Sequence, residues 1–214
     1  MTALLKYEWR RAGFAAGLAA PLALLLTVAF SVLADQAGRL LPAGLEAVFP
    51  LALAMAAVSV VVRESCRELH LTLPLRHVTT LGRRLGLIAG VAAAVCLPCT
   101  ALIVDTGPGW PGAILVWAAP AVFLGGLAVL VTVATRSAPV AATVVGLFWL
   151  AEQLFAGVFA VRAWPLFLFA TTRGVSGDWL ANRLALLGAG ALLLAAAAGL
   201  LTRPERLLNE EDEQ

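Results

Sequence analysis

The chain of 214 residues is 61% hydrophobic and only 13% charged, and its mean hydropathy is +0.93. Soluble domains are on average about 45–50% apolar and about 25% charged, so this composition excludes a soluble globular protein. It also excludes a disordered chain, which is poor in apolar residues. The composition indicates an integral membrane protein, and the formal charge of +2 is too small to indicate a nucleic-acid partner.

Six long apolar runs follow one another along the chain, and each is long enough to predict a transmembrane helix. They cover residues 13–34, 46–62, 85–104, 113–134, 139–160 and 184–201. The predicted fold class is therefore all-α, with residues 1–214 forming a single transmembrane domain of six spans. Only Thr135 to Pro139 separates the fourth run from the fifth, which predicts a tight helical hairpin.

The Lys and Arg residues are divided unevenly between the connecting segments. Eleven of them lie in residues 1–12, 63–84, 135–138 and 202–214. The other four lie in residues 35–45 and 161–183. Segments rich in Lys and Arg remain in the cytoplasm. Because the number of spans is even, both termini are predicted to be cytoplasmic, in a multi-pass protein of a bacterial cytoplasmic membrane.

Residues 1–12 precede the first span and have an amphipathic pattern. At 100° per residue, Trp9 falls on the apolar side, whereas Arg10 and Arg11 fall on the opposite side. Such a helix lies in the headgroup plane, with Trp9 at the acyl boundary and the two cations near lipid phosphates. The pattern therefore predicts an interfacial helix anchored by these three residues. A basic flank that only sets topology, or a cleaved signal peptide, are the alternatives.

The charged segment 63–84 connects the second and third spans. Pro74 is expected to end the helix that continues from the second span, because a proline disfavours helical dihedrals in the residue before it. Around it stand four leucines that nothing obvious in this chain would bury: Leu69, Leu71, Leu73 and Leu75. From the residues alone, this pattern fits two interpretations equally, and the first is a docking surface for another protein. The alternative is a topogenic loop whose leucines rest on the bilayer.

The segment from Glu64 through Arg67-Glu68-Leu69 to Thr72-Leu73-Pro74-Leu75 resembles the first cytoplasmic loop of type-2 ABC transporter permeases. The order of the elements is also similar: an amphipathic N-terminal helix, six spans, a tight link between the fourth and fifth, and an apolar external segment before the sixth. The resemblance implies that residues 63–84 hold a coupling helix that docks on an ATPase. Its expected docking residues are Arg67, Leu71, Leu73, Pro74 and Arg76.

The resemblance also implies partners and cofactors. In the family, two copies of a cytoplasmic ATPase subunit bind ATP and Mg²⁺ and act on a dimer, formed here by a second copy of this chain or by a related permease. Lys6, the only lysine, has no glycine-rich loop before it, which excludes a P-loop in this chain. The chain is therefore not expected to be an enzyme by itself, and no cofactor or metal site is predicted in it.

Glu152 is predicted to be the only ionisable residue well inside a span, and Gln153 follows it. Because a charge at mid-membrane costs about 2.5–3.5 kcal/mol on insertion scales, Glu152 is not expected to face lipid. Both residues are candidates for a substrate path or a dimer interface. Glu152 alternatively joins two helices of one subunit through hydrogen bonds. A proton relay would need a second ionisable partner, which the predicted spans do not offer.

The external segment 161–183 contains an apolar stretch, 163–170, that is too short to cross the membrane. It is expected either to re-enter the outer leaflet or cap an exit path, as external helices do in the resembled family, or to be a plain loop anchored by its aromatic residues. The resemblance implies that the function is export, and the apolar spans favour a lipophilic or amphipathic substrate, such as a lipid, a drug or a peptide. An ion- or proton-coupled carrier or channel, and a non-transporting membrane scaffold, are the alternatives.

Overall fold

A computed structural model describes residues 14–35, 37–63, 77–104, 109–162, 164–174 and 178–202. Within these ranges the chain is helical and contains no strand. The helices are α2 (Phe14–Leu33), α3 (Ala37–Ala43), a π-helical turn η1 (Gly44–Val48), α4 (Phe49–Arg63), α5 (His77–Val104), α6 (Gly109–Thr135), α7 (Ala138–Leu154), α8 (Ala156–Arg162), a 3₁₀ turn η2 (Trp164–Leu166) and α9 (Trp179–Leu201).

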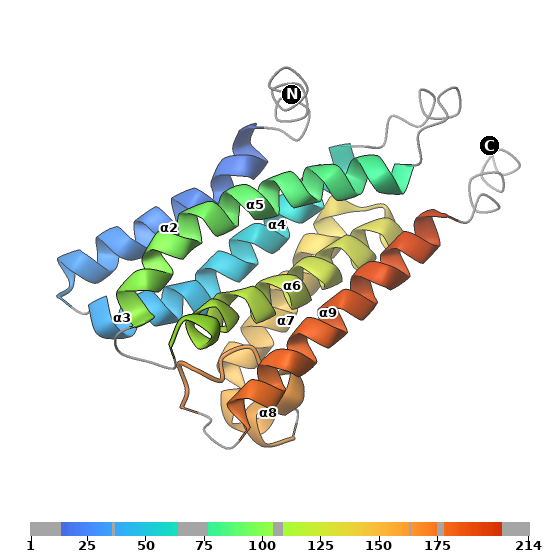
Figure 1. The fold of residues 1–214 in the computed structure, drawn as a ribbon. Coiled ribbons are helices and arrows are strands. Elements are labelled where there is room, and N and C mark those ends of the chain that lie inside the picture. The colour runs from blue at the N-terminus through green and yellow to red at the C-terminus, as the bar shows by residue number, and fades with distance from the viewer. Residues whose placement is uncertain are drawn as a thin grey trace, which may run out of the picture.

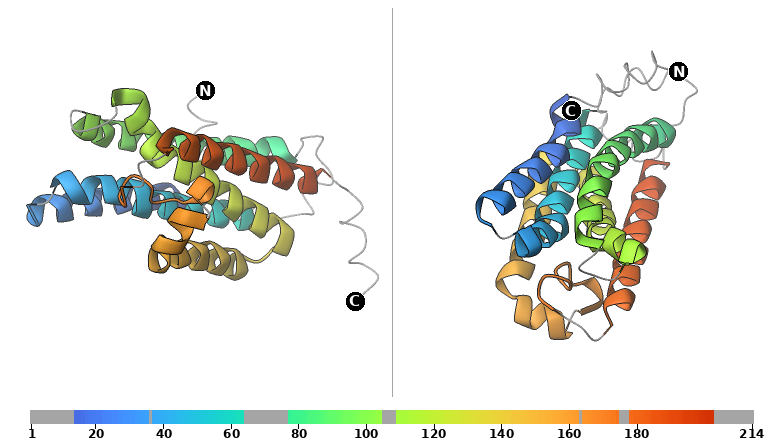
Figure 2. Two further views of the ribbon diagram at one scale, coloured as in Figure 1. Left: turned by 90° about the horizontal axis from the view of Figure 1, so that it is seen from below. Right: turned by 60° about the vertical axis from the view of Figure 1, so that its left-hand side comes forward.

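Six of these helices run side by side along the molecule: α2, α4, α5, α6, α7 and α9 (Figure 1). At one end, which we call the loop end, α4 finishes at Arg63 and α5 starts at His77, and the C-terminal end of α9 lies nearby. At the opposite end, which we call the α8 end, lie α3, α8 and the segment 164–174 (Figure 2). The two ends of the bundle therefore carry different structures.

Helix α6 occupies the centre of the bundle and packs against α4, α5, α7 and α9. Its sequence is apolar on all sides, which is the pattern of a helix that is buried on all sides. The face toward α9 includes Gly126, where an added Cβ would lie only 2.6 Å from the carbonyl oxygen of Gly190. The absence of side chains at these two glycines lets the backbones of α6 and α9 touch.

Four apolar helical stretches are long enough to cross a membrane: Leu40–Val62, Val78–Ala101, Gly109–Thr135 and Trp179–Leu201. The α7–α8 pair makes a fifth if it is counted as one broken span. The predicted first span corresponds to α2, of which the part Gly17–Leu33 is apolar. The prediction of an all-helical membrane protein is confirmed, with four or five helices that could cross the membrane. Six spans stay a prediction.

Two predicted spans differ from the observed helices. The second begins at Leu40 and not at residue 46, because Ala43 and Phe49 on either side of η1 both keep right-handed helical dihedrals. The helix thus continues through Glu46, which the prediction took as its edge. The fifth span, predicted over 139–160, is bent by 92° where α7 passes into α8.

The link between α6 and α7 is as short as the sequence predicts. It consists of Arg136 and Ser137, with Arg136 in the left-handed region at φ 54°. The hydroxyl of Ser137 accepts a hydrogen bond from the backbone N–H of Val140 at 3.5 Å and caps the start of α7. A proline in the first turn of α7 fits the same position.

Several predicted features lie outside the described residues. These are the interfacial helix with Trp9, Arg10 and Arg11, and the docking residues Arg67, Leu71, Leu73, Pro74 and Arg76. Residues 77–84, which the prediction assigned to the connecting loop, form the first turns of α5. The helix therefore begins well before the predicted third span at residue 85.

Candidate functional site

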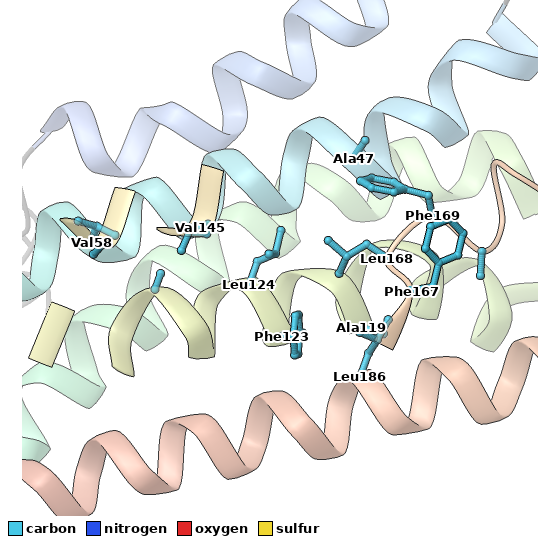
Figure 3. Packing of buried hydrophobic residues seen from close by; sticks show 14 residues of the cluster. Ala47, Val58, Ala119, Phe123, Leu124, Val145, Phe167, Leu168, Phe169 and Leu186 are labelled. Atoms are coloured by element: carbon cyan, nitrogen blue, oxygen red, sulfur yellow. The ribbon is translucent and has the colours of Figure 1, made fainter. Parts of the chain in front are cut away.

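The segment 164–174 folds back onto the α8 end of the bundle. Residues 167–170, Phe-Leu-Phe-Ala, are at most 2% exposed and join the largest apolar cluster of the structure. Phe167 and Phe169 contact each other edge to face, with ring centroids 5.9 Å apart. Figure 3 shows both rings beside Ala47 of η1, Ala119 of α6 and Leu186 of α9. Residues 167–170 are thus an internal part of the bundle end, whereas residues 172–174 are exposed.

The carboxylate of Glu46 binds the backbone of this segment. Its Oε1 accepts the N–H of Thr171 at 2.8 Å and its Oε2 accepts the N–H of Thr172 at 2.7 Å. The hydroxyl of Thr172 donates to Oε2 as well. Glu46 is 1% exposed, and a buried carboxylate is tolerated only when its oxygens are bonded in this way.

Arg183 of α9 binds the same segment from the opposite side. Its Nη2 forms an ion pair with Oε1 of Glu46 and donates to the Thr171 hydroxyl at 2.8 Å. Its Nη1 donates to the carbonyl oxygen of Leu168 at 3.0 Å. Arg183 and Glu46 are both fully buried, and they lie 137 residues apart in the chain. The planar guanidinium suits such a role because it donates in several fixed directions.

Helix α7 contributes the third tether. Oε2 of Glu152 accepts the backbone N–H of Leu168 at 2.8 Å, and Glu152 is fully buried. Leu168 therefore has its N–H held by α7 and its carbonyl held by Arg183 of α9. Side chains from η1, α7 and α9 converge on six residues of chain, 167–172.

Two neighbours of Arg183 on α9 complete the arrangement. The ring of Trp179 lies 5.7 Å from the guanidinium carbon, within cation–π range, and its Nε1 donates to the Thr171 hydroxyl at 2.9 Å. Nδ2 of Asn182 donates to the carbonyl of Phe167 at 3.0 Å and also to that of Trp164. Together these bonds satisfy irregular backbone at the bundle end, which is required where water is excluded.

The π-helical turn η1 explains how Glu46 reaches the segment. A π turn widens the helix and displaces its residues from the regular helical positions, and such turns are frequent at functional sites. Nε1 of Trp149 on α7 donates to the carbonyl of Ala47 at 3.1 Å. An added Cβ at Gly44 would lie 1.9 Å from Cγ2 of Thr27, so α2 approaches this turn closely. Packing on both sides therefore fixes the turn that carries Glu46.

Three buried polar atoms of the network have no hydrogen-bond partner in the described structure. They are Oε1 of Glu152, Oδ1 of Asn182 and Nε of Arg183. All three belong to residues that are at most 2% exposed. Each such atom costs free energy relative to its hydrated state, so the arrangement is incompletely satisfied as it stands.

A cavity of about 250 Å³ lies beside the network. Its walls are formed by Ala43, Ala47, Gln153, Phe169, Thr172 and Arg173. The predicted candidate Gln153 lines it and accepts a hydrogen bond from Nη2 of Arg173 at 3.3 Å. Gln153 and Glu152 thus face different surroundings: Gln153 lies at the cavity, and Glu152 lies in the sealed network.

Glu152 was correctly singled out as a buried ionisable residue, but its position and its isolation differ from the prediction. It lies in the last turn of α7, beside the bend, and not at the middle of a straight span. It is also not the only ionisable residue inside a helical stretch, because Glu46 and Arg183 lie within Leu40–Val62 and Trp179–Leu201. The sequence analysis missed both residues, since it placed each of them at the edge of a run or in a loop.

The described residues include two cysteines and no cluster of metal-ligating side chains. Within them no group of three His, Cys, Asp or Glu side chains is placed to hold a metal ion. Cys96 and Cys99 of α5 are free thiols, the first buried and the second half-buried. No protein-family model, no curated protein sequence and no solved structure matches this chain.

Proposed function

We propose that this chain is the membrane-spanning permease subunit of an ATP-driven ABC exporter. A separate cytoplasmic subunit, present in two copies, would hydrolyse ATP with Mg²⁺. A second copy of the chain, or a related permease, would complete the transport path. The substrate class would be lipophilic or amphipathic, such as a lipid, a drug or a peptide, because the apolar helices offer few polar groups for a hydrophilic solute.

The observation that supports this proposal best is the difference between the two ends of the bundle. At the loop end, α4 and α5 approach the connection that resembles an ATPase-docking loop. At the α8 end, short helices and the segment 164–174 fold onto the bundle just before the last long helix. The resembled family has its coupling loop and its external helices in the same order along the chain, and this similarity supports the proposal.

The proposed mechanism transmits a movement from one end to the other. Closure of the two ATPase subunits would shift residues 63–84 and tilt α4 and α5, which that connection joins. Helix α4 continues through η1 to Glu46, so a tilt that begins at the loop end reaches the network at the α8 end. The substrate surface would lie between the two permease subunits.

Copurification tests the assignment directly. The full chain is purified from its native cells in mild detergent, and the chains that accompany it are identified. We expect an ATPase subunit with a P-loop. If none accompanies the unaltered protein, the exporter proposal is wrong, and a carrier or a scaffold becomes the better account.

A double variant then locates the docking surface. Leu71→Asp with Leu73→Asp would place two carboxylates in an apolar pocket and remove about 4 kcal/mol of docking energy, a loss of roughly a thousandfold in affinity. The control Ser65→Asp with Thr79→Asp adds the same charge to the same region. The ATPase should be lost from the first variant only. Retention of the ATPase by the Leu71/Leu73 variant would refute the coupling assignment.

Orientation is tested separately by thiol labelling in a variant that lacks the native cysteines. A cysteine at position 176 is expected to react from outside the cell, and a cysteine at position 79 only from the cytoplasm. The eleven-to-four division of Lys and Arg is the basis for this expectation. Labelling of position 79 from outside would invert the topology and remove any contact with a cytoplasmic ATPase.

A proton-coupled carrier is the second candidate, because Glu46, Arg183 and Glu152 are all buried around one segment. Intramembrane ionisable groups often mark proton paths. Glu152→Gln separates the two functions, since it removes the titratable group and keeps a hydrogen-bond acceptor for Leu168. A carrier would lose transport with its fold intact, whereas an exporter that uses Glu152 as a tether would keep transport.

A further inference from the structure

The segment 164–174 is held at the α8 end largely by side chains that belong to other elements. Leu168, Thr171 and Thr172 give their backbone N–H groups to the carboxylates of Glu152 and Glu46. A regular helix would satisfy such groups through its own backbone, and no movement of a neighbour would release them. Here, a displacement of η1, α7 or α9 removes a bond to the segment.

The packing of α9 makes such a displacement mechanically simple. Helix α9 packs extensively on α6 and also on η2 of the segment itself, whereas it has no comparable contact with α4 or α7. The link from α9 to η1 is the ion pair of Arg183 with Glu46. Gly190, which touches the α6 backbone, lies seven residues from Arg183, roughly 10 Å along the helix. Pivoting at Gly190 would separate Arg183 from Glu46 and leave the backbone contact between Gly190 and α6 in place.

The energetics of the ion pair suit a contact that is made and broken. Burying two charges costs several kcal/mol per ion, which offsets most of their attraction. When the α8 end opens to water, Glu46 and Arg183 regain their hydration. The unpartnered atoms of Glu152, Asn182 and Arg183 would also find water there. An apolar contact gains nothing of this kind on opening, so the ion pair adds only a small margin to the stability that burial of residues 167–170 gives the closed state.

We propose that Glu46 and Arg183 form the latch of a gate, and that the gate is the segment 164–174. In the closed state the latch holds residues 167–170 inside the bundle end. In the open state the ion pair is broken, the segment moves away from α4 and α9, and residues 167–170 become accessible to water. The gate rests on the proposed function in two respects only: closure of the ATPase subunits would drive its opening, and the exported substrate would then pass through it.

Accessibility of Ala170 measures the gate directly. Ala170 is 2% exposed and small, so Ala170→Cys introduces a thiol with little change in volume. The reporter is placed in a full-length chain whose cysteines at 66, 96 and 99 are replaced by alanine. The protein is reconstituted into phosphatidylcholine nanodiscs, and the rate of reaction with a membrane-impermeant maleimide is recorded without ATP or any ATPase.

Glu46→Gln and Arg183→Gln are each combined with the reporter, and Arg162→Gln serves as the control. Arg162 lies in α8 at the same end and is exposed, so Arg162→Gln loses the same positive charge as Arg183→Gln without touching the network. Because removing one partner of a buried pair is strongly unfavourable, each latch variant should raise the labelling rate about tenfold or more. The control should leave the rate unchanged.

A rise of less than about tenfold in the labelling rate of folded, monodisperse latch variants would overturn the proposal. An equal rise in the control would overturn it as well. Should the glutamine variants fail to fold, Arg183→Lys replaces them. A lysine cannot bind Glu46 and the Leu168 carbonyl with the fixed fork of arginine, so its labelling rate must also rise. Slow labelling of a folded Arg183→Lys protein contradicts the latch.

The outcome of this experiment does not depend on whether the exporter proposal is correct. Labelling uses the isolated chain, so a latch can be demonstrated even if no ATPase copurifies with it. Conversely, an ATPase partner with no latch effect would leave the exporter proposal standing and refute the gate.

Discussion

Helix α9 makes two contacts of opposite character within a short distance. At Gly190 its backbone lies against α6, and an added Cβ would be 2.6 Å from the carbonyl oxygen of Val122. At Arg183, two turns earlier, the helix binds Glu46 and the backbone of the segment 164–174 through polar side-chain atoms, next to the apolar packing of Leu186 on that segment. The first contact is between backbones, and the second is made by charges.

The difference shows how α9 can be fixed at Gly190 and still be able to separate from its partners at Arg183. Close backbone contact depends on shape and is lost only by separating the helices. A buried ion pair gains hydration when it breaks, so its net contribution is small although each partner depends on the other. The following predictions break one contact or the other, from the largest expected effect to the smallest.

Arg183→Met removes the cation and leaves Glu46 buried without its counter-charge. We expect a loss of about 3–5 kcal/mol in the free energy of unfolding, seen as a fall of roughly 10 °C in the thermal midpoint in detergent. Adding Glu46→Gln to this variant should restore part of the loss, because the uncompensated charge is then removed. If the two changes are simply additive, Glu46 and Arg183 are not coupled.

Gly190→Ala tests the backbone contact. Its Cβ would meet Val122 backbone atoms at 2.6–2.7 Å, which neither helix can avoid by a side-chain rotation. We expect a loss of about 3 kcal/mol from overpacking, measured by the same thermal unfolding. Gly188→Ala on the same helix is the matched control, since nothing lies within 4 Å of its added Cβ. Equal midpoints for the two variants would refute the close approach.

Glu152→Leu removes the acceptor of the Leu168 N–H and leaves that group buried and unsatisfied. The cost is expected to be about 2 kcal/mol. Glu152→Gln should cost far less, because its amide oxygen still accepts from Leu168. A comparison of the two thermal midpoints separates a hydrogen-bonding role from a role for the charge, and a large loss in the glutamine variant would favour the charge.

Arg173→Gln should have the smallest effect. Its guanidinium is exposed and reaches Gln153 at 3.3 Å, a weak contact screened by solvent. We expect a change of about 0.5 kcal/mol or less in unfolding free energy. A loss comparable to that of Arg183→Met would mean that charge in general, and not the buried pair, stabilises this end.

The sequence predicts most of the helices because long apolar runs and their polar separators are local features. The tight α6–α7 link and the burial of Glu152 could both be read in this way. The bend of 92° after Leu154 could not be, since no proline stands there and Phe155, which leaves the helical dihedrals at φ −108° and ψ 32°, carries no local turn signal. Local pattern predicts an element, and tertiary contacts decide where it bends.

The central ion pair was beyond local reasoning for a different reason. Glu46 and Arg183 each interrupt an apolar run at its edge, where a charge usually marks the membrane boundary. Only their proximity across 137 residues shows that each is satisfied inside the bundle. The apolar pattern continues beyond each charge, to Leu40 before Glu46 and to Trp179 before Arg183. This continuation is the signal that would have placed both residues within helices.

Hydrogen exchange of the backbone amides tests the contrast between the two contacts most directly. The unaltered protein and Glu46→Gln are compared in nanodiscs, and exchange is followed in residues 167–172 and in the α6 stretch 122–130. Glu46→Gln should accelerate exchange in residues 167–172 and leave the α6 stretch unchanged, because only the polar contact is released. Equal acceleration in both regions, or none in residues 167–172, would contradict the account.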